Sequence, residues 1–125
     1  MSRTRPILVV DDQFGVRRLV QEVFVGTGYP VVTAANGREA LEIAAARPPV
    51  LVLLDMKMPV MDGLETLRKL KAADPNLVVM MMTAVGDQDR VQEALHSGAH
   101  TCIAKPFDVF ALRDQVLGLL REAEA

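Results

Sequence analysis

The sequence predicts an α/β fold, an open doubly wound sheet of five parallel strands. Five short apolar runs recur along the chain, at 7–10, 31–34, 50–54, 77–82 and 101–104. The central runs are continuous rather than alternating, which is typical of strands that are buried on both faces. Helical patterns lie between the runs, so the order is strand–helix repeated five times. With 125 residues, the chain is too short for a closed eight-stranded barrel, which needs about 200 residues or more.

Each predicted strand is followed by a predicted helix. After the first strand, apolar residues form one stripe at helical spacing: Val16, Leu19, Val20, Val23 and Phe24. The same kind of spacing predicts the later helices, in the segments 40–44, 64–70, 91–95 and 109–120. Turn and cap residues agree with these boundaries: Gly28, Asn36-Gly37, Asp87, Gly98 and Asp108. Strands that alternate with helices imply a parallel sheet with right-handed crossovers.

Composition indicates one domain, 1–125, with its core from about 6 to 121 and no output domain. Half of the residues are hydrophobic and the net charge is −2 with mixed signs, which gives no nucleic-acid or membrane surface. Cys102 is the one cysteine, so an internal disulfide is excluded. The first apolar run has four residues, too few for a signal peptide or a membrane span. We expect a cytoplasmic monomer.

Polar residues stand where the predicted strands end. The first strand ends in Asp11-Asp12, the third in Asp55, the fourth in Thr83 and the fifth in Lys105. In the flavodoxin-like strand order 2-1-3-4-5, the chain reverses direction across the sheet between strands one and three, and ligands bind there. The three acids are therefore expected to meet at one corner, with the threonine and the lysine beside them.

This set of residues is suited to phosphoryl chemistry. Three carboxylates that lie close together cannot all stay ionised without a cation, and oxygen ligands in an open site favour Mg²⁺, with Mn²⁺ possible. Thr83 offers a hydrogen-bond donor and Lys105 a point charge for a phosphate. Asp55, at the end of the central strand, is the candidate nucleophile that forms an acyl phosphate. Each residue alone has a simpler interpretation; Asp12, for example, could be no more than a cap of the following helix. The five residues together, each at a predicted strand end, favour a phosphoryl site.

Four motifs then carry a resemblance to a known family. VVDDQ at 9–13, LLDMKMPVMDG at 53–63, MTA at 82–84 and AKPFD at 104–108 resemble the CheY-like receiver domain of bacterial two-component response regulators. The resemblance covers nearly the whole chain, and each motif alone would be weak. Within the family, the motifs are most similar to those of single-domain sporulation phosphorelay intermediates.

The resemblance implies roles for individual residues. Asp55 would be the phosphoacceptor and, with Asp12 and the backbone carbonyl of Lys57, would bind Mg²⁺ directly. Asp11 would act through a metal-bound water. The phosphoryl oxygens would be held by four groups: the side chains of Thr83 and Lys105 and the backbone N–H groups of Met56 and Ala84. The Lys105–Pro106 peptide bond would be cis.

The resemblance also implies partners rather than a small-molecule substrate, so we expect a phosphoacceptor and not an enzyme. A sensor histidine kinase would donate the phosphoryl group from its phosphohistidine, and a histidine phosphotransferase would receive it; an aspartyl-phosphate phosphatase is a further candidate partner. Six residues around the site are the predicted contacts: Gln13, Gly15, Lys57, Pro59, Pro106 and Phe107.

One position departs from the family pattern. Many receivers carry an aromatic residue three positions before the lysine, and here that position is Cys102. The departure favours a phosphotransfer relay over a strong conformational output. Lys57 and Val85 would partly screen the acyl phosphate from water, so we expect slow self-hydrolysis. A chemotaxis-like receiver, a receiver cut from a DNA-binding regulator, a receiver-shaped binding module and a Mg²⁺-dependent aspartyl phosphohydrolase remain as alternatives.

Overall fold

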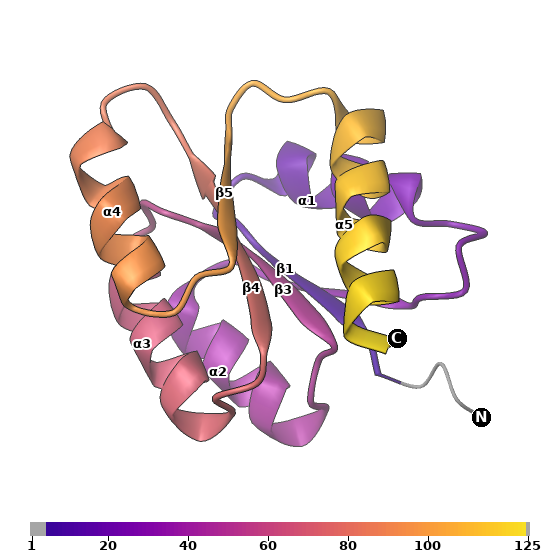
Figure 1. Ribbon diagram of the computed structural model, residues 1–125, viewed down its shortest axis with the longest axis horizontal. Helices are drawn as coiled ribbons and strands as arrows, with labels where there is room; N and C mark the ends of the chain where they lie inside the picture. Colours follow the sequence, from indigo (N-terminus) through magenta and orange to yellow (C-terminus); the bar gives the residue numbers. More distant parts are fainter. Residues whose placement is uncertain (1–4, 125) are drawn as a thin grey trace.

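The structure is a computed structural model that describes residues 5–124 (Figure 1). Strands and helices alternate along the chain: β1 (Ile7–Val10), α1 (Phe14–Val23), β2 (Val31–Ala34), α2 (Gly37–Ala46), β3 (Leu51–Asp55), α3 (Gly63–Ala73), β4 (Val78–Thr83), α4 (Gln88–His96), β5 (Thr101–Ala104) and α5 (Val109–Glu124). All five predicted strands and all five predicted helices are present. No helix within the described part of the chain is both long and apolar enough to cross a membrane.

The sheet has the predicted order, β2-β1-β3-β4-β5, and every pairing is parallel. Val10, the last residue of β1, lies opposite Ala34 on one side and Leu54 on the other. The carboxyl ends of the three strands are therefore level. Asp55 extends β3 one residue further, so it stands at the edge of the sheet next to the end of β1.

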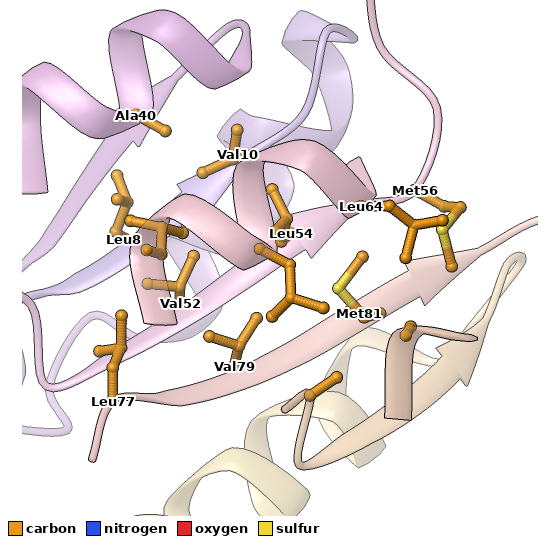
Figure 2. Packing of buried hydrophobic residues seen from close by; sticks show 14 of the residues in the cluster. Leu8, Val10, Ala40, Val52, Leu54, Met56, Leu64, Leu77, Val79 and Met81 are labelled. Carbon is orange, nitrogen blue, oxygen red and sulfur yellow. The ribbon is translucent and has the colours of Figure 1, made fainter. Parts of the chain in front are cut away.

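The helices cover the sheet unequally, with α1 and α5 on one face and α2, α3 and α4 on the other (Figure 1). Alternate strand residues supply the two cores. Leu8, Val52 and Leu54 belong to the core under α2, α3 and α4, and Figure 2 shows them among side chains of both strands and helices. Leu53 and Met80 belong to the core under α1 and α5. Burial on both faces explains why the central strands β1, β3 and β4 are nearly continuous apolar runs.

Helix ends close to the site are fixed by short polar side chains. Asp62 accepts a hydrogen bond from Glu65 N–H (3.0 Å) and is the N-cap residue of α3. Asp108 accepts one from Phe110 N–H (2.8 Å) at the start of α5, as its sequence position predicts. These bonds satisfy N–H groups that have no partner within the helix.

Candidate functional site

The carboxyl ends of β1 and β3 bring three acidic residues together. Asp11 directly follows β1 and is fully buried, and Asp55 ends β3 and is 8% exposed. Asp12 is exposed at the rim. Each of the three offers a carboxylate oxygen, and these oxygens all lie within 4.8 Å of one another. The buried strand therefore places the Asp55 carboxylate rigidly beside the other two acids.

Lys105, which directly follows the edge strand β5, also reaches the cluster. Its Nζ donates hydrogen bonds to Asp11 Oδ2 (2.7 Å) and to Asp55 Oδ1 (3.4 Å). Its backbone N–H donates to the carbonyl of Thr83 (2.6 Å), and the Lys105–Pro106 bond is cis, as the resemblance implies. Thr83 is buried nearby, and its hydroxyl donates a long hydrogen bond to the Ile103 carbonyl (3.4 Å). The Lys105 ammonium group thus contacts two of the three carboxylates, those of Asp11 and Asp55.

Burial and the neighbouring charges shift the pKa values of Asp55 and Lys105. Burial raises the pKa of Asp55 to about 6; the neighbouring charge of Asp11 adds to the increase and Lys105 opposes it. For Lys105, burial disfavours the charge, but the hydrogen bond and the charges of Asp11 and Asp55 together raise its pKa above the ordinary value. The protein alone therefore leaves negative charge poorly compensated at Asp55.

The donor set fits a small divalent cation. Asp11, Asp12 and Asp55 present only oxygen ligands, at an open edge where water molecules can complete the coordination. A divalent cation would also offset the charge that raises the pKa of Asp55. This chemistry suits Mg²⁺ or Mn²⁺ and disfavours zinc, which prefers nitrogen and sulfur ligands.

Helix capping does not account for the acid pair. The N-cap residue of α1 is Gln13, and its side chain makes no capping bond. Asp11 Oδ1 instead accepts a hydrogen bond from the N–H of Gln13 (2.9 Å) and so shapes the turn after β1. Arg17 supports the same turn by donating to the Asp11 carbonyl (2.6 Å). No pattern in the sequence predicts that role of Arg17, because the bond depends on how α1 lies over the turn.

The loop between β3 and α3 holds Asp55 from the other side. Gly63 N–H donates to the Met56 carbonyl (2.8 Å), and Val60 adopts a positive φ of 73°. The N–H of Met56, which we expected to hold phosphate, donates to the Met82 carbonyl (3.0 Å) as part of the sheet. The Lys57 ammonium lies 3.5 Å from Asp87 Oδ1, across the gap to the next loop.

The loop between β4 and α4 differs most from expectation. Ala84 N–H donates to Asp87 Oδ2 (2.7 Å), and Asp87 is buried. Asp87 occupies the N-cap position of α4 that the sequence predicts, but its side chain makes no capping bond with the helix. The motifs in the sequence do not place Asp87 in the site. The feature that could have indicated it is an acidic residue four positions after Thr83.

The predicted contact residues fall on two sides of the cluster. Gln13, Pro106 and Phe107 line an apolar groove of about 550 Å³, together with Val16, Leu19, Ala84, Val85 and Lys105. Lys57 and Pro59 line a separate, more open hollow, together with Asp12, Met58, Asp62 and Arg90. Gly15 is exposed on α1 and lines neither. Cys102 packs half-buried against the core, and burial raises the pKa of its thiol.

Comparison with known proteins identifies the class. A family model described as the response regulator receiver domain matches residues 7–117, and the chain belongs to that family. The predictions of a receiver and of its fold are confirmed.

Three individual proteins show how similar this chain is to known receivers. The chain is 52% identical to sporulation initiation phosphotransferase F of Bacillus subtilis (strain 168) over 110 residues, which are 88% of this chain and 89% of that protein. It is 38% identical to the regulatory protein AtoC of Escherichia coli (strain K12) over 87% of this chain but 24% of that protein. A CheY-like receiver structure from Methanospirillum hungatei JF-1 superposes with a TM-score of 0.90 at 29% identity, covering 96% of each chain.

Proposed function

We propose that Asp55 accepts a phosphoryl group from the phosphohistidine of a sensor histidine kinase. The observation that carries this proposal is the position of the Asp55 carboxylate: buried at the sheet edge, near two other acids and hydrogen-bonded to Lys105. In the reaction, an Asp55 carboxylate oxygen forms a bond to phosphorus while the phosphorus–nitrogen bond breaks. The electron pair of that bond leaves with the imidazole, which takes up a proton.

The residues around Asp55 have separate tasks in this step. Asp11, Asp12, Asp55 and the Lys57 carbonyl would hold Mg²⁺ or Mn²⁺, which supplies positive charge beside the transferring group. Lys105 and the Thr83 hydroxyl are placed to bind phosphoryl oxygens. Both predicted backbone donors already have a partner: Met56 N–H donates to the Met82 carbonyl in the sheet, and Ala84 N–H donates to the Asp87 side chain. Ala84 N–H is the better supported donor, because a side chain can turn away from it without breaking the sheet.

The Asp55 phosphoryl group is then passed on to a histidine of a phosphotransferase protein. Three observations support a relay: the identity to sporulation initiation phosphotransferase F over most of both chains, the non-aromatic Cys102, and the apolar groove beside the site. Pro106 and Phe107, which follow Lys105 in the chain, line the groove, and Leu19 of α1 lines it as an exposed side chain. A helix that presents a histidine could bury its apolar side there.

Other predictions concern further partners and the setting of the protein. Gly15, Lys57 and Pro59 would add contacts at the rim, and an aspartyl-phosphate phosphatase would bind the same side. The cytoplasmic location, the monomeric state, the single-domain organisation and the sporulation pathway stay predictions. So does the expectation that the protein, without being an enzyme on a separate substrate, assists its own phosphorylation and dephosphorylation.

The proposal is tested by intact-mass analysis after incubation with acetyl phosphate and Mg²⁺. We expect one phosphoryl group on the parent protein, and none on Asp55→Asn or when a chelator replaces the metal. A label on Asp55→Asn would place the acceptor elsewhere. The absence of any label would leave a binding module with the shape of a receiver.

The relay is tested separately, with phosphoprotein freed from its donor. We expect the label to decay slowly in isolation and to disappear rapidly when a histidine phosphotransferase domain is added, with the phosphoryl group recovered on that domain. Rapid loss as free phosphate, with or without the domain, would favour a short-lived switch.

A further inference from the structure

Asp87 is a buried acid next to the site that the proposed phosphotransfer does not use. It is 1% exposed. Its Oδ2 accepts a hydrogen bond from Ala84 N–H at 2.7 Å. Among residues 5–124, its Oδ1 is buried without a hydrogen-bond partner. The Lys57 ammonium lies 3.5 Å from this oxygen and forms an ion pair with it, but not a hydrogen bond. A buried oxygen of this kind is unfavourable and indicates a role beyond packing.

Helix capping does not explain Asp87. The capping residues Asn36 and Asp62 have extended backbones, with ψ of 173° and 171°, and their side chains reach forward to N–H groups of the helix. At Asp87 ψ is 6°, and the side chain makes no bond to the first turn of α4. It turns back instead to Ala84, which precedes it in the chain.

Ala84 directly follows Thr83, and its N–H is the backbone donor assigned above to a phosphoryl oxygen. A phosphoryl group on Asp55 would need the same donor that Asp87 already holds. One N–H hydrogen cannot make two well-aligned bonds, and two anions at one donor repel each other. We propose that the Asp87 carboxylate holds Ala84 N–H in the unphosphorylated protein and competes with the phosphoryl group for it. This inference rests on the proposed function.

The competition has a consequence for the relay. Phosphorylation would displace Asp87 from Ala84, and Asp87 is joined to Lys57 and stands at the start of α4. The site therefore holds the phosphoryl group less tightly than it would with a free N–H, which makes onward transfer easier. By reciprocal linkage, any partner that draws Asp87 away from Ala84 strengthens phosphoryl binding.

The test uses beryllofluoride with Mg²⁺, which mimics a phosphoryl group on a carboxylate, and calorimetry to measure its affinity. In Asp87→Ala the donor is free, so we expect binding at least roughly tenfold tighter than in the parent, as for one hydrogen bond to a charged group. In Asp87→Asn the amide oxygen can still accept from Ala84 N–H, so the gain should be clearly smaller. Asp89→Ala is the matched control, because it removes an exposed acid from the first turn of α4; its affinity should change by less than about twofold.

Two patterns would overturn the inference. Equal affinity in the parent and Asp87→Ala would show that Asp87 does not compete. Equal gains in Asp87→Ala and Asp87→Asn would show that only the charge matters and that Ala84 N–H is not contested.

A second measurement needs no variant and so does not depend on the variants folding. Nuclear magnetic resonance can detect the scalar coupling across the hydrogen bond between Ala84 nitrogen and the Asp87 side-chain carboxyl carbon. We expect this coupling in the free protein and its loss with beryllofluoride bound. A coupling that persists in the bound state contradicts the inference while leaving the proposed function intact. Failure of the parent to bind beryllofluoride, or equal binding by Asp55→Asn, would instead refute the proposed function.

Discussion

Gly63 is the residue through which a single added methyl group should disturb the Asp55 site. It begins α3, and its N–H donates to the Met56 carbonyl. A Cβ at this position would lie 2.3 Å from the Asp55 carbonyl oxygen and 2.7 Å from the Met56 carbonyl oxygen, both closer than the 3.0 Å that real Cβ atoms keep. Both contacts are with backbone atoms at the end of β3, so no side chain can move aside. Gly63→Ala must displace the loop, the helix or the end of the strand.

The expected cost follows from two opposing effects. Forcing an extra carbon into a filled space costs about 1–3 kcal/mol. Alanine is up to about 1 kcal/mol better than glycine within a helix, and less so at its first residue. We therefore expect Gly63→Ala to lower the free energy of unfolding by about 1–2 kcal/mol, and to slow labelling by acetyl phosphate because Asp55 moves.

Urea unfolding monitored by circular dichroism measures the effect, with Gly118→Ala as the matched control. Gly118 lies inside α5, and a Cβ there meets no atom within 4 Å. The same chemical change should therefore stabilise the protein by up to about 1 kcal/mol at that site. If Gly63→Ala proves as stable as Gly118→Ala and its labelling rate is unchanged, the argument that the loop packs tightly against the end of β3 is refuted.

Three further predictions concern the same edge of the sheet. Val60 has a φ of 73°, so Val60→Gly should raise the free energy of unfolding by up to about 1 kcal/mol in urea; a loss of stability would show that the valine is not strained. The pKa of Asp55 rises from its ordinary 3.8 to about 6, so the folded state binds its proton more tightly than the unfolded state, and this group's contribution to stability falls as pH increases between these values. With a chelator present, Asp55→Asn should be more stable than the parent by on the order of 2 kcal/mol at pH 7.5, and the difference should vanish near pH 4 in thermal unfolding; a pH-independent difference would contradict the assignment. In the parent, the hydrogen bond from Glu65 N–H lowers the pKa of Asp62. Asp62→Ala loses this bond and should lower the free energy of unfolding by about 1 kcal/mol at pH 7. Because the ionised carboxylate stabilises the fold and is lost on acidification, the denaturation curves of the two proteins should converge as pH falls below about 4.

The sequence was sufficient for the fold and for the corner where the site lies, for a physical reason. Strand runs buried on both faces are visible as continuous apolar segments, and parallel strands bring their carboxyl ends to one edge. Asp55, Thr83 and Lys105 could be placed by that rule alone.

The details that could not be predicted depend on side-chain directions and backbone geometry at strand ends and in loops. Asp87 looked like an ordinary helix cap, and only the backbone at ψ 6° turns its carboxylate toward Ala84. Met56 N–H looked available, but the ladder between β3 and β4 continues one residue beyond Asp55 and uses it. The positive φ of Val60 had no sequence signal either, because valine rarely adopts it.

The most direct test of the central claim is to locate the phosphoryl group itself. Borohydride reduces an aspartyl phosphate to homoserine, which marks the phosphorylated residue permanently, and peptide mass spectrometry then finds it. After labelling with acetyl phosphate and Mg²⁺, we predict homoserine at position 55 and aspartate at positions 11, 12 and 87. Homoserine at another acid, with position 55 unchanged, would contradict the assignment of Asp55 as the phosphoacceptor.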